Sequence, residues 1–364
     1  MESGNLTVAD SAPYLRRILE LARWAPSGDN TQPWRFEIIN DKHIAIHGHD
    51  TRDHVIYDFD GHPSHMAHGA LLETLRLAAT RFGSKADWSI RPEQSDSAPI
   101  YDVILHPSAC SEDPLVPFIE QRTVQRRPMS TTPLLPEQKE ALVAAVGGNY
   151  SLQFFESFKD RLAVAHLLWK NAYLRLTCPE AYPVHRDIIE WNARYSADRI
   201  PDQAVGVDPW TAKLMHWVMQ SWERVDFFNR YLTGTIAPRL QLEFLPAMGC
   251  ASHILLKPKQ TQSGLMDHIA AGVALQRLWL TASRLGLHLQ PEMTPVIFRW
   301  YAQAGRKISA KPEINVGAIK LARQFEQLTS TQPETGFAFF CRVGHSKVPH
   351  SRSLRKELRE LLMK

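Results

Sequence analysis

The residues whose types and spacing best suit chemistry lie in one loop, residues 25–34, which read APSGDNTQPW. Two prolines, a glycine and several short polar side chains so close together predict irregular structure rather than a helix or strand. Pro26 and Gly28 should end the preceding helix and leave backbone amides free. Ser27 and Asn30 add side-chain donors and acceptors. We therefore expect this loop to bind a polar ligand; a proline-capped turn is the alternative.

A second polar segment, residues 121–128 (QRTVQRRP), carries basic residues within a proline-rich stretch from 111 to 136. By composition this stretch is a linker. Arginine also suits a dianionic phosphate, because charge-assisted hydrogen bonds are roughly twice as strong as neutral ones. For any one of these basic residues, a solvated surface charge is the alternative interpretation.

The other reactive side chains form no catalytic or metal-binding pattern. No Ser-His-Asp, Cys-His or paired-carboxylate arrangement stands out, so no catalytic side chain is predicted. The four cysteines are scattered, which argues against a disulfide framework or a structural zinc site. Histidines gather in one region but lack a motif such as HExxH, so exposed or capping roles are favoured and no metal is predicted. These histidines are His43, His47, His49, His54, His62, His65 and His68.

Composition sets the class of protein. The chain has 364 residues, 44% hydrophobic and 22% charged, and its length predicts two domains or one duplicated domain. A net charge of +4 without a long basic run argues against nucleic-acid binding. The polar N-terminus is unlike a signal peptide, and no apolar stretch is long enough to cross a bilayer. A cytoplasmic protein without membrane contact is expected.

Hydrophobic periodicity predicts alternating helices and short strands around the loop. In chain order these are a helix at 13–25, strands at 35–40 and 43–48, a helix at 69–83, a strand at 101–107, a helical region at 159–232, a helix at 272–286, a strand at 336–344 and a basic terminal helix. The region 159–232 is unusually aromatic, and core packing is the favoured interpretation for most of its aromatic residues. They are Trp169, Trp191, Trp210, Trp217, Trp222, Phe227, Phe228 and Tyr231.

An internal repeat is the most informative feature of the organisation. Residues 65–83 align without gaps with residues 268–286, and nine of the nineteen positions are identical, including glycines at matched places. An apolar strand follows each copy, at 101–106 and 337–343. Two amphipathic helices that share Leu and Ala by composition are the alternative, but composition poorly explains the matched glycines. The repeat predicts a duplicated α+β domain.

The loop APSGDNTQPW, flanked by LARW and RFEII, resembles the A-P-S-x-x-N-x-Q-P-W signature of the nitroreductase superfamily of FMN flavoproteins. The resemblance implies that the loop grips the pyrimidine edge and ribityl chain of FMN. The residues implied are Pro26, Ser27, Gly28, Asn30 and Gln32.

Each half of the chain carries what the other lacks. Family members open with an R-x-S-x-R/K motif that holds the FMN phosphate; it is missing ahead of residue 25, and 121–128 resembles it instead. Val124 and Gln125 both intervene before Arg126, so either Gln125 or Arg126 could take the basic position. The phosphate candidates here are Arg122, Thr123, Gln125 and Arg126. No APSxxN loop follows at the expected distance in the second half, where residues 153–160 read QFFESFKD.

This complementary loss resembles the fused twin-repeat (Acg-type) branch of the superfamily, in which one chain imitates the family's homodimer. The implied fold is α+β, a nitroreductase-like fold duplicated within one chain, with antiparallel or mixed sheets flanked by helices. The expected halves are 1–117 and 118–364, with an aromatic helical insert at about 180–250. One complete FMN site and one ruined site would result, and a monomer would suffice.

Later segments resemble the family more weakly but in the right order. Residues 286–293 (GLHLQPEM) correspond to the segment that runs under the isoalloxazine ring and offers backbone N–H groups near N5 and O4. The candidates there are Leu289, Gln290, Pro291 and Glu292. In the tail, Arg352 is the best match for the phosphate-binding arginine and Lys347 the second. An intervening EW…D…IP segment is made of Glu190, Trp191, Asp198, Ile200 and Pro201.

The implied activity is NAD(P)H-dependent reduction of a planar electron-poor acceptor, a nitroaromatic or a quinone. Flavin N5 would carry the chemistry, so the protein's task is binding and orientation. An FMN-sequestering or regulatory protein with little turnover is the alternative, because the aromatic insert could close the substrate space. A specialised dehydrogenase or flavin-fragmenting enzyme is a third, weaker possibility.

Overall fold

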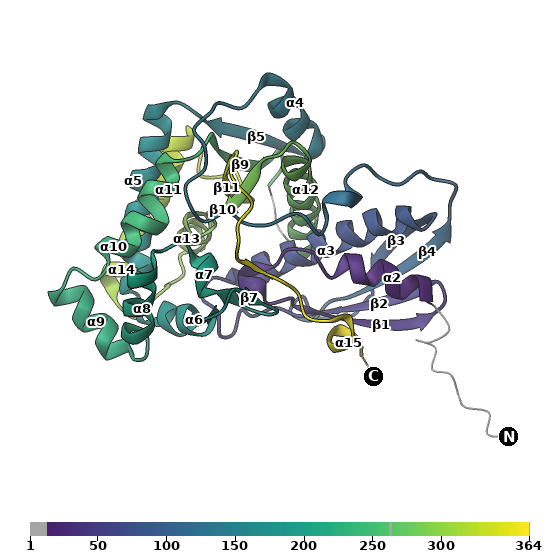
Figure 1. Ribbon diagram of the computed structural model, residues 1–364, viewed down its shortest axis with the longest axis horizontal. Helices are drawn as coiled ribbons and strands as arrows, with labels where there is room; N and C mark the ends of the chain where they lie inside the picture. Colours follow the sequence, from purple (N-terminus) through teal and green to yellow (C-terminus); the bar gives the residue numbers. More distant parts are fainter. Residues whose placement is uncertain (1–12, 262–263, 364) are drawn as a thin grey trace.

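Two four-stranded antiparallel sheets with the same strand order form the frame of the molecule. The computed structural model describes residues 13–261 and 264–363 (Figure 1). The first sheet has the order β1-β2-β4-β3 and the second the order β5-β9-β11-β10. The strands are β1 (Trp34–Asn40), β2 (His43–Gly48), β3 (Ser84–Ile90), β4 (Ile100–Pro107), β5 (Tyr150–Phe155), β9 (Ser252–Pro258), β10 (His288–Pro291) and β11 (Phe339–Gly344).

The helices also occupy matching places in the two halves. In the first, α2 (Pro13–Ala22) precedes β1, and α3 (His62–Arg81) connects β2 to β3. In the second, α4 (Pro136–Ala145) precedes β5, and α12 (Leu265–Arg284) connects β9 to β10. The predicted α+β class, with antiparallel sheets flanked by helices, is therefore confirmed.

The helices α3 and α12 cross in direct contact between the two sheets (Figure 1). A Cβ atom added to Gly69 would lie 2.0 Å from the Ile269 carbonyl oxygen, and one added to Gly272 would lie 2.0 Å from the Met66 oxygen. The two contacts exchange under the offset of 203 residues that relates the repeats. Matched glycines were therefore required, because only a residue without Cβ lets the backbones approach this closely.

Polar contacts along the same crossing obey the same symmetry. Arg277 Nη1 lies 2.9 Å from Glu73 Oε1, and Gln276 Nε2 donates to Thr74 Oγ1 at 2.8 Å. Adding 203 to residues 73 and 74 gives 276 and 277, so each pair is the counterpart of the other.

The chain returns from the second half to the first at its C-terminal end. After β11, the short strand β12 (Arg352–Ser353) pairs in parallel with β7 (Tyr195–Ser196). The tail then reaches β1, where the Met363 N–H donates to the Phe36 oxygen at 2.8 Å. Figure 1 shows this tail in yellow beside the purple N-terminal elements. The predicted terminal helix is only one turn, α15 (Leu358–Leu361), because other residues of the tail are extended and pair with β7 and β1.

The second half contains more helices than the first. Between β5 and β9 lie α5 (Phe158–Thr177), α6 (Tyr182–Asp187), the strand pair β6 (Ile189–Glu190) and β8 (Ile200–Pro201), α7 (Asp202–Val205), α8 (Pro209–Val218), α9 (Trp222–Tyr231), α10 (Ile236–Pro238), the π-helical η5 (Arg239–Phe244) and α11 (Leu245–Met248). After β10 follow α13 (Thr294–Gln303) and α14 (Pro312–Thr329). None of the described helices is long and apolar enough to cross a membrane.

The interpretation of the aromatic residues as core was wrong. None of the eight named aromatic residues is buried, and Trp210 and Tyr231 are 81% and 69% exposed. The helices α8 and α9 contain no buried residue at all. They pack over a hollow rather than against a filled core, as the next section describes.

Candidate functional site

A cavity of about 790 Å³ is lined by residues from both halves of the chain. It brings together loop 26–33, residues 122–126, the end of β10 and the C-terminal tail, which are far apart in sequence. Eleven of the fourteen residues singled out from the sequence line it. They are Pro26, Ser27, Gly28, Asn30, Arg122, Thr123, Arg126, Gln290, Pro291, Glu292 and Arg352.

The other three, Gln32, Gln125 and Leu289, lie behind the cavity wall. The Gln32 amide nitrogen donates to the Asn30 and Ala197 oxygens, at 3.0 and 2.9 Å. The Gln125 amide nitrogen donates to Ser346 Oγ at 2.9 Å, so the amide holds the tail. Of the two alternatives for the basic position, Arg126 lines the cavity and Gln125 does not.

Loop 26–33 is held in an unusual backbone conformation. Three of its non-glycine residues have positive φ: Asp29 (48°), Asn30 (65°) and Gln32 (50°). Such conformations cost on the order of 1–3 kcal/mol each and persist where the surroundings over-determine them. Here the Gln32 N–H donates to Ser27 Oγ at 2.9 Å, and Asn30 Nδ2 donates to the Ala197 oxygen at 3.1 Å. Ser27 and Asn30 therefore fix the loop's shape as well as facing the cavity.

Three arginines converge at one end of the cavity: Arg122, Arg352 and Arg355. Arg122 Nη2 donates to the Trp24 oxygen at 3.1 Å, and Arg355 Nε donates to the Ala25 oxygen at 3.0 Å. The guanidinium of Arg122 also lies over the Trp279 ring, 4.3 Å from its centroid. The cluster thus joins the APSGDN loop, residues 120–122 and the tail.

The three arginines have hydrogen-bond donors and positive charges without protein partners. Among the described residues, none of the three guanidinium groups forms an ion pair, and the buried Nε atoms of Arg122 and Arg352 have no partner. Burial, and then the other two arginines, hold the pKa of Arg122 well below its usual range; burial and neighbouring arginines lower that of Arg355 to about 9. A bound anion would relieve this mutual repulsion. The sequence reasoning missed Arg355, although it follows Arg352 by three positions.

The strand β10 also borders the cavity, through Gln290 and Pro291 at its end. Pro291 has no N–H, and the Glu292 N–H donates to the Phe340 oxygen at 2.8 Å within the sheet. The expectation that these two residues offer backbone N–H groups to a ligand is therefore corrected, because the sheet and the proline ring use those positions. The Glu292 carboxylate instead contacts His253 and Arg342, two residues that the sequence reasoning did not select.

The aromatic insert, residues 180–250, covers the cavity. Its inward-facing side chains are mostly apolar: Val184, Leu214, Met215, Val218, Met219, Trp222, Val225, Phe228 and Leu232. Polar residues of the insert line the cavity too, among them Thr211, Asn229 and Glu243. The Tyr57 hydroxyl lies 2.8 Å from His185 Nε2. Burial lowers the pKa of His185 to about 3, so its ring is neutral.

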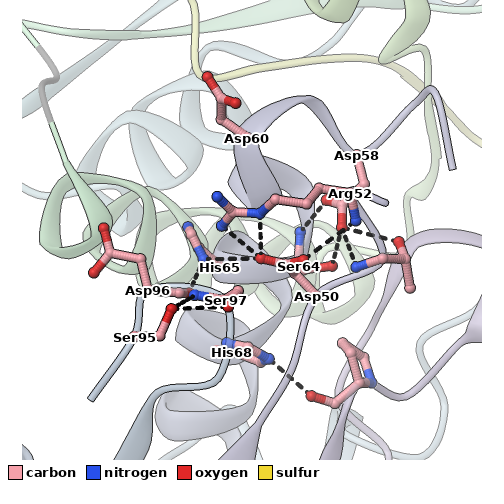
Figure 2. Close-up of polar contacts among 12 residues, drawn as sticks. Asp50, Arg52, Asp58, Asp60, Ser64, His65, His68, Ser95, Asp96 and Ser97 are labelled. Atoms are coloured by element: carbon pink, nitrogen blue, oxygen red, sulfur yellow. Dashed lines mark hydrogen bonds and ion pairs between the residues drawn. The ribbon is translucent and has the colours of Figure 1, made fainter. Parts of the chain in front are cut away.

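A hydrogen-bond network joins the segment from Asp50 to Asp58 to the start of α3 at Ser64 (Figure 2). Asp58 accepts from the Thr51 N–H and from Ser64 Oγ, both at 2.7 Å, and so ties the loop to the start of α3. Figure 2 also shows Asp50 between Arg52 and His65, at 2.5 and 3.9 Å. The loop is thereby rigid on both sides of residue 57.

The histidines that raised the metal question have protein partners. His43 lies 2.8 Å from Asp102 Oδ1, His47 lies 2.7 Å from Glu37 Oε2, and His65 lies 2.8 Å from the Asp96 oxygen. In the part of the chain that the structure describes, no group of His, Cys, Asp or Glu side chains could hold a metal ion.

Four histidines, His68 and His268 buried and His62 and His185 half-buried, predict that stability falls in mild acid. Burial lowers the pKa of His62 to about 4 and those of His68, His185 and His268 to about 3. In the unfolded chain they bind protons near pH 6.5. Between these values the unfolded state holds more protons, so each histidine lowers the free energy of unfolding by up to about 1.4 kcal/mol per pH unit as pH falls.

Urea unfolding between pH 7 and pH 5 measures this slope. His268, which stacks on His62 with ring centroids 3.7 Å apart, provides the comparison. His268→Phe is expected to reduce the slope by the equivalent of about one proton. An identical slope in the variant would show that His268 is already charged in the folded state.

A comparison with known protein families supports the resemblance seen in the loop. Residues 11–62 match the model of the nitroreductase family, which confirms the family resemblance over that segment. No curated protein matches the chain.

Several solved structures show limited similarity. The FMN-dependent nitroreductase of Mycobacterium smegmatis in complex with NADPH is 13% identical, with a TM-score of 0.36 over 67% of this chain and 94% of that one. A nitroreductase with bound FMN from Desulfitobacterium hafniense is 13% identical, with a TM-score of 0.33 over 65% and 93%. An iodotyrosine deiodinase bound to FMN and 3-iodo-L-tyrosine is 12% identical, with a TM-score of 0.35 over 67% and 95%. TM-scores at this level do not establish a shared fold, and the site is assigned without them.

Proposed function

Since residues 11–62 carry nitroreductase-family sequence, we propose that the chain binds one FMN in the cavity and acts as an oxidoreductase with it. The observation that supports the proposal most directly is that the loop and the arginine cluster line one cavity. The family's APSGDN loop, from the first half, faces three arginines without carboxylate partners, from residue 122 and the tail.

The residues present fit the chemical groups of FMN. The free Nε donors of Arg122 and Arg352, together with Arg355, suit the phosphate. The buried Oδ1 of Asn30 and Oε1 of Gln290 have no partner among the described residues and could accept from the ring's N–H. The volume of about 790 Å³ also lies within the range of cofactor and small-ligand sites, roughly 300–1,000 Å³.

In this proposal the protein supplies binding, orientation and exclusion of water. Bound FMN would supply hydride transfer at N5, with NAD(P)H as the donor. The strained loop and β10 would fix the ring, while the apolar side chains of α8 and α9 would accept a planar, electron-poor acceptor such as a nitroaromatic or quinone. Tyr57, which contacts His185, is one of the polar groups that line the cavity.

We propose further that the halves 1–117 and 118–364 arose by duplication, so that one chain forms both sides of a site that a homodimer would otherwise build. The equal strand orders and the reciprocal glycine contacts support this proposal. A monomer would then suffice for cofactor binding.

The purified protein is expected to contain about one FMN per chain, because it has one APSxxN loop and one arginine cluster. The absorption spectrum with a protein assay gives this ratio, and light scattering on dilution gives the oligomeric state. A ratio near two would contradict the single-site proposal. A ratio near zero after soaking with FMN would remove the flavin assignment, and flavin release in step with subunit separation would place the site between chains.

The aromatic insert also favours a second candidate, an FMN-sequestering protein, because it lines the same cavity that a substrate must enter. Anaerobic mixing of the yellow protein with NADPH separates the two. Rapid bleaching of the flavin supports the enzyme, and an unchanged spectrum supports sequestration.

A further inference from the structure

Three charged residues, contributed by three strands of the second sheet, are buried beside the cavity. His253 on β9, Glu292 at the end of β10 and Arg342 on β11 are 0%, 6% and 2% exposed. Glu292 Oε2 lies 2.7 Å from His253 Nδ1, and Glu292 Oε1 lies 2.9 Å from Arg342 Nη1. Glu292 and Arg342 also line the cavity.

The hydrogen bonds of this triad fix its protonation. His253 Nε2 lies 3.0 Å from the Ala247 carbonyl oxygen, which can only accept, so Nε2 carries a hydrogen. His253 Nδ1 faces a carboxylate that already accepts from Arg342, a contact that favours the ionised acid. Both ring nitrogens therefore donate, and His253 is an imidazolium. Burial is the largest single influence and opposes this state, but the Glu292 charge, Cys250 and the hydrogen bonds to both together outweigh it and raise the pKa of His253 to about 10.

The triad consequently holds two cations and one anion, a net charge of +1 inside the protein. The nearby charges do not cancel it. Arg175 and Glu243 pair with each other at 2.5 Å, and the carboxyl group of Asp29 faces Arg126 and Arg175. The buried Arg342 Nε has no partner among the described residues. A charge in this setting acts strongly on its neighbours, because the protein interior screens far less than water.

We propose that the triad His253–Glu292–Arg342 is a fixed positive charge that raises the reduction potential of a flavin bound in this cavity. The charge thereby favours the reduced flavin. The inference rests on the proposed function. A hydride carries two electrons and one proton from the reduced nicotinamide, which leaves oxidised, so a ring that accepts it gains one negative charge. A nearby buried cation stabilises that charge and makes reduction more favourable.

Two substitutions with different effects on the net charge test the proposal. Glu292→Gln removes the carboxylate that keeps the buried His253 protonated, so His253 becomes neutral, the net charge stays at +1 and the midpoint potential of bound FMN is expected to change little. His253→Gln lowers the charge to zero and is expected to lower the potential. The shift in His253→Gln should correspond to at least a tenfold change in the ratio of oxidised to reduced flavin at fixed potential, about 30 mV for a two-electron couple. Anaerobic equilibration with a reference dye gives the values.

A structural role alone would not separate the two variants in this way, because both remove the same contact between His253 and Glu292. The matched control is Glu37→Gln, which alters another carboxylate–histidine pair that does not line the cavity and should leave the potential unchanged. If either variant of the triad fails to fold, Arg342→Gln should lower the potential and Arg342→Lys should restore it. Equal shifts in the two variants, or no shift in His253→Gln, in proteins that retain one FMN would overturn the proposal while the cofactor assignment stands.

The charge state can also be measured without flavin. In the apoprotein, nitrogen-15 NMR is expected to show His253 doubly protonated at pH 8. A neutral imidazole there would overturn the inference even if FMN binds, whereas a failure to bind FMN would overturn the proposed function and leave the imidazolium intact.

Discussion

Arg122→Ala is expected to weaken FMN binding by roughly ten- to a hundredfold. The substitution removes a charge-assisted contact to a phosphate, which contributes about 1.5–3 kcal/mol. Arg122 is suited to this contact because its Nε is buried without a partner and its ring contact with Trp279 holds the guanidinium in place. Titration of apoprotein with FMN, followed by fluorescence quenching, gives the dissociation constant.

Two further variants make this result specific. Arg127→Ala is the matched control, because Arg127 lies in the same segment but contacts only the Gln203 oxygen at the surface. Its affinity for FMN should be unchanged. Asn30→Ala should cost less, about 0.5–1.5 kcal/mol, because it removes a neutral hydrogen bond, and it should shift the flavin spectrum. Unchanged affinity in Arg122→Ala would mean that the phosphate is held elsewhere and that residues 121–128 are only linker.

Gly69→Ala and Gly272→Ala are each expected to destabilise the fold by several kcal/mol. The added Cβ would overlap a backbone carbonyl oxygen of the opposite helix, so α3 and α12 must move apart and open the core on both sides. Helix propensity acts in the other direction, since alanine is better than glycine by about 1 kcal/mol. A measured loss therefore reports the crossing itself.

Urea denaturation of both variants and of the double variant gives the free energies of unfolding. The double variant should lose less than the sum, because the first separation of the helices already makes room for the second Cβ. Gly148→Ala is the control, since nothing lies within 4 Å of its added Cβ, and it should stay within about 0.5 kcal/mol. A gain of stability in Gly69→Ala would show that the helices are not in close contact.

Features governed by local sequence were predictable. The alternation of apolar residues in 43–48 and 101–107 predicted β2 and β4, and the matched glycines of 65–83 and 268–286 predicted two equivalent helices. The cavity-lining loop was predictable because proline, glycine and short polar residues break a helix in a recognisable way. Arg122 and Arg352, 230 positions apart, could be placed together only through the family resemblance.

The remaining features depend on tertiary structure. Aromatic residues at helical spacing indicate core packing only where a core is present, and α8 and α9 instead pack over a hollow. Nothing local marks Asp29 or Gln32 for positive φ, since distant hydrogen bonds hold the loop. His253 and Arg342 gain their importance from Glu292, which only the pairing of three strands brings to them.

The path of the tail also constrains the order of events during synthesis. The residues of the first sheet leave the ribosome early in synthesis, and domains generally fold as they emerge. However, Arg352 and Arg355, which complete the arginine cluster, and residue 363, which pairs with β1, emerge after all of the other elements that line the cavity. Cofactor capture must therefore wait until translation has passed residue 355. Until then the newly made chain has an unpaired edge at β1 and an incomplete arginine cluster.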